Sequence, residues 1–392
     1  EGTIEYKYNN EGGYVSGIAN QREDLFNGDF ITQIIVKNNK NEIIKTIDFS
    51  YDYFVSNYGV GEFNPDGVFN PYRYKRLKLT AVKENGKPSY KFGYIEDIKL
   101  PPVQSFAIDF LGFYNNSADV TSRQQMLSLK PRPKLYYYPN NFEKSLVPFP
   151  VPNKTPNIID GYFNREANEY AKAWSLNKIT FPTGGFSEFF YESNQFQFMG
   201  ENIKGGGVRI QKQTLSDGNV ARSIEYTYLN DSGKSSGSLS SMPYFGHPEI
   251  KFFNVNVDTR AIPPTATSTT ITPDIFHWKI FGKSNVNKDI TSGSYVGYSK
   301  VVEKEIGNGR IESYFTTNEV QDFKDYILRL YPQDGNVTTS LVSNACMADF
   351  IISNSGIESE IFTDNGYKRG QLLEELIYDE TNQLLKKSKN EY

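Results

Sequence analysis

Short runs in which apolar and polar residues alternate recur along most of this chain. A period of two is the spacing of a β-strand whose two faces differ, and Asn, Asp, Gly and Pro between such runs are typical of tight turns. Six segments show the order strand, turn, strand and are predicted to be antiparallel hairpins. Five of them turn at 38–41, 85–86, 182–185, 216–219 and 307–309, and the sixth spans 370–392.

One of these hairpins allows a residue-by-residue prediction. In "FPTGGFSEFFYE", Gly184 and Gly185 are predicted to form the turn, with a positive φ in at least one of them. The alternation then assigns the following residues to two faces. Phe186, Glu188, Phe190 and Glu192 should share one face, and Ser187, Phe189 and Tyr191 the other.

The remaining stretches divide the chain into three regions. Residues 1–129 and 176–392 are predicted to be β-hairpin regions that form one continuous assembly, separated by a Pro- and Asn-rich insertion over 130–175. Residues 231–275 are expected to be long surface loops. Helical patterns are confined to 165–174 and 318–330. The predicted fold is mostly β, with consecutive antiparallel hairpins forming large curved sheets and only a few short helices.

Composition fits this picture and limits the partners. Hydrophobic residues make up 38% of the 392 residues, whereas aromatic residues reach 15%, which suits sheets whose faces are half exposed to water. The 42 basic and 46 acidic residues are interleaved without a basic stripe, so nucleic acid is not expected as a partner. No apolar run is long enough to span a bilayer.

Both ends of the chain show strand patterns. "GTIEYKYNN" and "LLKKSKNEY" alternate up to the limits of the sequence. A self-contained domain usually protects such edges, because unpaired main-chain groups invite further pairing. We therefore expect at least one end to be an edge strand of a sheet, and the native chain to extend past it.

Candidate catalytic chemistry is sparse. The only cysteine, Cys346, and the two histidines, His247 and His277, do not stand at metal-ligand or nucleophile spacings and are interpreted as structural. Gly205–Gly207 precede a strand pattern rather than a helix, so they are interpreted as a tight entry to a strand and not as a phosphate loop. No metal, no cofactor and no catalytic triad are predicted.

Paired carboxylates leave an alternative open. Glu188 and Glu192, or Asp48 and Asp52, lie four residues apart and would share a strand face, where they could line a groove as glycosidase carboxylates do. The simpler interpretation is the solvated face of an amphipathic strand. Tyr-rich segments likewise suit either a sugar-binding platform or cross-strand packing within a sheet.

Two decapeptides far apart in the chain are nearly the same. "IEYKYNNEGG" begins at Ile4 and "IEYTYLNDSG" at Ile224, and Tyr378-Asp379 occurs in "ELIYDETNQLL". Hairpins with Tyr-x-Tyr or Tyr-Asp before a polar turn resemble the YD-repeat, or RHS-repeat, family. The marks of this resemblance are Tyr6, Tyr8, Tyr226, Tyr228, Tyr378 and Asp379.

Further segments are similar to the non-repetitive region of RHS-like proteins of Bacteroidetes. They include "KLPPVQSFAIDFLGFYNN", "WSLNKITFPTGGFSEFFYE", "GYSKVVEKEIGNGRIESYFT" and "RGQLLEELIYD". The uneven spacing and the Pro-rich insertions depart from the regular repeat.

The resemblance implies a part of a larger exported protein. Such proteins form β-hairpin shells, often around a C-terminal effector such as a toxin, and act extracellularly or at the cell surface; in Bacteroidetes, type IX secretion would export them. The expected function is a non-catalytic scaffold that encloses or presents an effector or mediates surface interaction. The expected partners are other segments of the same polypeptide, or a surface or secretion protein. An extracellular carbohydrate-binding protein is the first alternative, and a glycan-active hydrolase using Glu188 and Glu192 the second.

Overall fold

The structure is a computed structural model, and most of the chain is described by it. The described residues are 2–9, 22–25, 28–56, 71–103, 105, 107–116, 134–137, 146–159, 161, 165–240, 243, 245–252, 273–280, 294–317, 326–330, 359–363 and 365–392.

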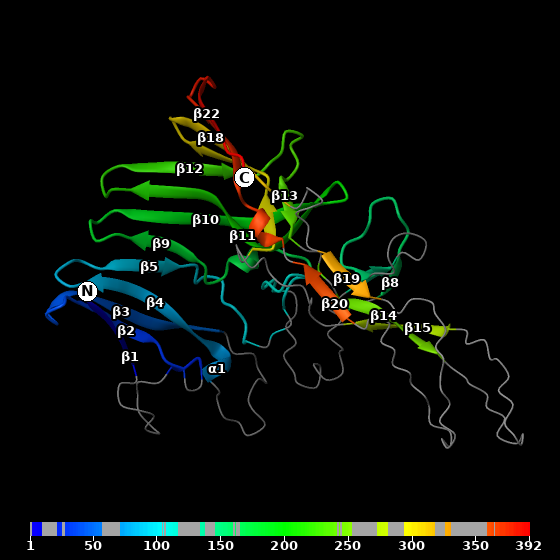
Figure 1. Cartoon of the computed structure of the whole chain (residues 1–392), viewed down its shortest axis with the longest axis horizontal. Coiled ribbons are helices and arrows are strands. Elements are labelled where there is room, and N and C mark those ends of the chain that lie inside the picture. The colour runs from blue at the N-terminus through cyan, green and yellow to red at the C-terminus, as the bar shows by residue number, and fades with distance from the viewer. Residues whose placement is uncertain are drawn as a thin grey trace, which may run out of the picture.

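One open antiparallel sheet of thirteen strands dominates the fold, as the hairpin pattern predicted (Figure 1). Its strands neighbour one another in chain order, from β1 at one edge to β22 at the other, and β5 pairs with β9. In spatial order they are β1 (Thr3–Tyr8), β2 (Ile31–Lys37), β3 (Ile43–Val55), β4 (Lys75–Glu84), β5 (Tyr90–Tyr94), β9 (Leu176–Thr180), β10 (Phe186–Phe198), β11 (Glu201–Ser216), β12 (Ala221–Thr227), β17 (Lys300–Glu305), β18 (Gly309–Phe315), β21 (Leu372–Tyr378) and β22 (Leu384–Lys389).

All six predicted hairpins are present. They are β2–β3, β4–β5, β9–β10, β11–β12, β17–β18 and β21–β22. The predicted turn of the third is confirmed, because Gly184 has a φ of 92° and the Phe181 amide donates to the Gly185 carbonyl at 2.8 Å. Both chain ends are also edge strands, as expected.

Four small sheets lie beside the large one (Figure 1). They pair β13 (Gly237–Leu239) with β16 (Val296–Tyr298), β14 (Gly246–Phe252) with β15 (Pro273–Ile280), β19 (Tyr326–Leu330) with β20 (Ser359–Thr363), and β6 (Leu135–Tyr137) with β7 (Leu146–Val147) and β8 (Asn157–Ile159). The prediction of loops over 231–275 was therefore wrong at β13, β14 and the start of β15. Their pairing partners lie far away in the chain, so local composition did not indicate the strands.

The helix predictions hold only in part. Within 165–174 there is only a 3₁₀ helix, η1 (Glu169–Lys172), which the Asn168 side chain caps through the Tyr170 amide. The second prediction was wrong over Tyr326–Leu330, which is strand β19, and 318–325 lie outside the described residues. "YILRL" is a short apolar run whose period fits a helix or a strand equally well. Its pairing with β20 makes it a strand. Two further short elements are α1 (Pro71–Tyr74) and the 3₁₀ helix η3 (Gly366–Lys368).

The main hydrophobic core lies where the β10–β11 hairpin meets the small sheets. Its buried members are Leu111, Phe149, Phe196, Phe198, Leu239 and Val296. The hairpin supplies Phe196 and Phe198 from β10, while β13 and β16 supply Leu239 and Val296.

Gly205–Gly207 form a bulge beside this core. Contrary to the prediction of a strand entry, they lie inside β11, where Ser193 is opposite Val208 and Gln195 opposite Lys204. The three glycines thus face the single residue Asn194, whose amide donates to the Gly206 carbonyl at 2.7 Å. Gly207 has a φ of 88°, and a Cβ there would stand 2.7 Å from the Phe113 ring. The bulge needs glycine because both the backbone angle and the space exclude a side chain.

Candidate functional site

The cross-strand register divides the large sheet into two unlike faces. One, the apolar face, is made of alternate residues of successive strands, most of them half-buried, and it also carries the ion pairs Lys45–Glu84 at 2.8 Å and Arg222–Glu305 at 3.6 Å. Its side chains include Ile34, Val36, Ile47, Phe49, Tyr51, Tyr53, Leu77, Leu79, Val82, Phe92, Ile179, Phe189, Tyr191, Ile210, Leu215, Ile224, Tyr226, Ile311 and Ile377.

The opposite, charged face is a ladder of ion pairs between neighbouring strands. They include Glu5–Lys37 at 2.6 Å, Asp52–Lys78 at 3.3 Å, Glu192–Arg209 at 2.7 Å, Lys300–Glu312 at 3.5 Å and Glu374–Lys387 at 2.8 Å. Each exposed pair stabilises by no more than about 1 kcal/mol. The ladder distinguishes this face from the apolar one, although the charged face also holds the buried side chains of Ile35 and Phe54.

A main-chain segment of the same protein lies on one end of the apolar face. The Tyr53 hydroxyl accepts from the Glu23 amide at 2.9 Å, and the Tyr51 hydroxyl donates at 2.9 Å to the carbonyl of Ile31, the first residue of the neighbouring strand β2. The Phe30 ring packs edge-on against Tyr51 with 4.9 Å between ring centroids. At this end of the face, the Tyr53 hydroxyl therefore bonds the backbone of a segment that precedes β2.

The two similar decapeptides have different environments. Tyr6 and Tyr8 are exposed on the edge strand β1, and the chain needs 22 residues to return from Tyr8 to its partner Ile31. Tyr226 is half-buried on the apolar face in β12, and Tyr228 just beyond it is buried. The second copy ends in a tight turn that begins at Asn230, whereas positions 10–13 of the first copy lie outside the described residues.

Tyr228 belongs to a buried stack around Arg209. The guanidinium carbon lies 4.3 Å from the Tyr228 ring centre and 5.1 Å from that of Tyr298, and Nε bonds Glu192. The Tyr228 hydroxyl donates to the Ile210 carbonyl at 2.6 Å. Burial raises the pKa of Tyr228. Cation–π contacts of this kind hold the β12 end onto β11, so Tyr228 has a structural position.

Asp379 starts a turn that recurs in the chain. Its Oδ1 accepts from the amides of Thr381 and Gln383, both at 2.8 Å, and Asn382 has a φ of 66°. These bonds hold the pKa of Asp379 below its ordinary value, and the bond from the Gln383 amide has the largest effect. The same pattern, with bonds to the third and fifth residues and a positive φ at the fourth, begins at Asn38, Asp109 and Asn230.

Sequence reasoning did not find this common turn. A signal exists, since Asn or Asp is followed three residues later by Gly or Asn in all four cases. Tyr378 adds its own contact, because the Arg310 guanidinium lies 4.0 Å from the ring centre. The tyrosine–aspartate pair is thus a strand-end ring followed by a turn-forming carboxylate.

The paired carboxylates are not arranged as a glycosidase pair. Glu192 is bonded to Arg209, and Glu188 stands opposite Lys178 and Thr214 in the register. Residues four apart in one strand are separated by roughly 13 Å of backbone, more than the carboxylate spacing of glycosidases. Asp48 accepts from the Gln33 amide at 2.6 Å, and Asp52 pairs with Lys78. These groups belong to the charged face.

The remaining candidates give no cluster. His247 is opposite Lys279 and His277 opposite Glu249 in the β14–β15 pair, and Cys346 lies outside the described residues. In the described ranges, no three His, Cys, Asp or Glu side chains are grouped as a metal site would need. None of the described helices has the length and hydrophobicity to cross a bilayer.

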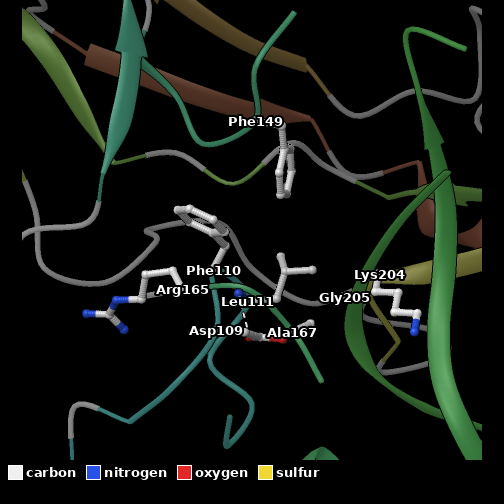
Figure 2. Close-up of a pocket in the computed structure, with 8 residues that line it drawn as sticks. All are labelled: Asp109, Phe110, Leu111, Phe149, Arg165, Ala167, Lys204 and Gly205. Atoms are coloured by element: carbon white, nitrogen blue, oxygen red, sulfur yellow. Dashed lines mark hydrogen bonds between the residues drawn. The ribbon is translucent and has the colours of Figure 1, made fainter. Parts of the chain in front are cut away.

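A small hollow lies beside the core and contains a buried carboxyl group (Figure 2). Its lining includes Asp109, Phe110, Phe149, Arg165 and Lys204, and its roughly 150 Å³ includes space open to solvent. Ligand sites are usually about 300 Å³ or larger. Asp109 is 3% exposed, and burial raises its pKa to about 6. Its Oδ1 accepts from Leu111 and Phe113, so the carboxyl serves the turn through that oxygen, while Oδ2 has no hydrogen-bond partner among the described residues.

No family description matches the sequence, and no curated protein is significantly similar to it.

Proposed function

We propose that this protein is a non-catalytic β scaffold that holds a polypeptide against the apolar face of its large sheet. The observation that supports the proposal most is the half-buried apolar face, which extends from β2 to β21 and is interrupted by the ion pairs Lys45–Glu84 and Arg222–Glu305 and by the polar residues of β17. Extended apolar surfaces of this kind are typical of interaction sites. The bond between the Tyr53 hydroxyl and the backbone amide of Glu23 supports polypeptide as the occupant.

The resemblance to RHS/YD-repeat proteins supports the same proposal and extends it. On this view the chain is a segment of a larger exported protein, acts extracellularly or at the cell surface, and encloses or presents an effector. The Tyr378-Asp379 hairpin and the repeated Asx turn are the local features that favour this kinship. Fractionation of cells expressing the full-length gene tests the localisation, because a purely cytosolic product would contradict export.

Two neighbouring phenylalanines allow a matched test of the binding face. Phe189 is on the apolar face and Phe190 is exposed on the charged face, beside Lys212. The probe is a permanently unfolded polypeptide, reduced and carboxymethylated lactalbumin, measured by fluorescence polarisation. Phe189→Ser should weaken binding about tenfold or more, since a buried Phe contributes about 2 kcal/mol, whereas Phe190→Ser should leave it unchanged.

The alternatives give different results. Equal effects of the two substitutions, or no binding by the parent chain, would contradict a polypeptide-holding face. A glycan-array signal lost on Tyr6→Ala or Tyr8→Ala would favour a carbohydrate-binding protein. A hydrolase activity abolished by Glu188→Gln would favour an enzyme.

A further inference from the structure

The two edge strands of the large sheet differ in how open they are to another strand. In the part of the chain that the structure describes, β1 pairs only with β2, and β22 only with β21. Edge strands present a row of main-chain donors and acceptors that another strand can pair with. Natural proteins commonly guard such edges with lysine or proline, and the two edges can be compared on that basis.

The β22 edge has a guard. Its sequence "LLKKSK" places exposed lysines at 386, 387 and 389. If β22 met its own copy antiparallel about a two-fold axis, residues of the same face would stand opposite each other. Centring that axis on Lys386, Lys387 or Ser388 always puts a lysine opposite a lysine, and like charges directly opposite are destabilising.

The β1 edge carries a single lysine, Lys7, and is self-complementary. Ile4, Tyr6 and Tyr8 point to the apolar side and are 59%, 51% and 46% exposed. Glu5 and Lys7 alternate with them on the charged face. When β1 meets its own copy antiparallel with Tyr6 on the axis, Glu5 stands opposite Lys7 twice and Ile4 opposite Tyr8 twice.

Registers centred one residue away are less favourable, because they place like charges directly opposite each other. Moving the axis to Glu5 puts Glu5 opposite Glu5, and moving it to Lys7 puts Lys7 opposite Lys7, while the faces still match. The Tyr6-centred register also extends the existing ion pair of Glu5 with Lys37 of β2 into a ladder across the junction. The arrangement is closed, because a two-fold axis uses the same patch on both copies.

We infer that the partner of the β1 edge is a second copy of this chain, joined antiparallel about Tyr6, so that two thirteen-stranded sheets form one continuous sheet. The apolar faces then lie on the same side and double the surface available to a bound polypeptide. The inference stands apart from the proposed function, since it concerns the edge of the sheet and not its face.

Cross-linking tests the register directly. In a Cys346→Ser background, which removes the only cysteine, Tyr6→Cys would place two thiols at the axis, about 5 Å apart at Cβ. A short bis-maleimide reagent should then convert most of the protein to a covalent dimer. The matched control is Leu385→Cys on β22, which is also exposed and should not be converted to a covalent dimer. Failure of Tyr6→Cys to cross-link, or equal cross-linking of Leu385→Cys, would overturn the inference.

Charge exchange tests the ion pairs. By analytical ultracentrifugation the parent should sediment as twice the 44.7 kDa chain at high concentration. Glu5→Lys and Lys7→Glu should each weaken dimerisation about tenfold, and the double exchange should restore it, with circular dichroism confirming the fold. A parent that stays monomeric contradicts the proposal.

A head-to-tail contact between β22 and β1 is the rival arrangement. It would pair Lys387 with Glu5 of the next copy and would produce open-ended oligomers. In that case Lys387→Glu would dissociate the assembly and the double exchange at positions 5 and 7 would not rescue it. Two-fold pairing predicts that Lys387→Glu leaves association unchanged.

Discussion

The same turn gives its first residue opposite acid–base behaviour in two places. Asp379 and Asp109 both accept from the third and fifth amides of the turn. At the exposed Asp379 these bonds lower the pKa of the carboxyl, whereas at Asp109 burial outweighs them and the pKa rises to about 6. Solvent exposure therefore decides whether the pKa of the carboxyl rises or falls, and the hydrogen bonds alone do not.

Asp109→Asn is predicted to stabilise the protein at neutral pH. Asn38 and Asn230 show that an amide oxygen accepts the same pair of bonds, so the turn should persist. With a folded pKa of about 6 against an ordinary 3.8, the folded chain keeps this proton between about pH 4 and 6 while the unfolded chain loses it. Stability from this group is therefore full below about pH 4 and falls as pH rises to about 6.

Urea unfolding at a series of pH values measures this effect. The Asp109→Asn substitution should raise the free energy of unfolding at pH 7 by up to about 3 kcal/mol, and the gain should shrink toward pH 4. Asp379→Asn is the matched control and should not stabilise at pH 7. A gain that is the same at every pH would show that Asp109 does not titrate in this window.

Elements formed by neighbouring sequence were predictable. The six hairpins have Asn, Asp, Gly or Pro at their turns and period-two runs on both sides, and all six are present. The strands β13 and β14 were missed because neither is joined to its partner by a tight turn: β13 pairs with β16, and β14 ends 21 residues before β15 begins. The apolar face was visible only as alternation, since register across many strands decides which alternate residues meet.

The glycine bulge of β11 gives a prediction at the scale of an element. Gly207→Ala combines a backbone φ of 88° with a Cβ at 2.7 Å from the Phe113 ring. Gly86 has a similar φ of 75° in the β4–β5 turn, where nothing lies within 4 Å of an added Cβ. Gly86→Ala should therefore cost about 1–2 kcal/mol of stability from the backbone alone, and Gly207→Ala clearly more, because overpacking adds about 1–3 kcal/mol.

Thermal unfolding of both variants separates the cost of the left-handed backbone from the cost of the contact with Phe113. The strain in a left-handed backbone is common to the pair, so the difference between them reports the Phe113 contact. Equal losses at the two positions would mean that the ring moves away freely and that the bulge does not fix the hairpin against the core. A specific loss at Gly207 would show that the junction of hairpin and core depends on this close approach.

At the scale of the whole molecule, the fold combines a well-packed core with a thin sheet. Phe196 and Phe198 from β10 meet Leu239 and Val296 in the buried cluster. The strands from β2 to β5 contribute few buried side chains, chiefly Ile35 and Phe54. Local opening follows the density of buried apolar contacts, so the two ends of the sheet should open before the core does.

Native-state hydrogen exchange measures this order. Amides near residues 194–208, where the hairpin enters the core, should exchange only through global unfolding, and those of β22 should exchange fastest among the sheet strands. Amides of β1 should become more protected as protein concentration rises, because dimerisation through Tyr6 covers that edge, while those of β22 should not change. Protection of β22 that rises with concentration instead would place the contact at the lysine-guarded edge, and a uniform rate across all strands would mean that the sheet and its core unfold as one unit.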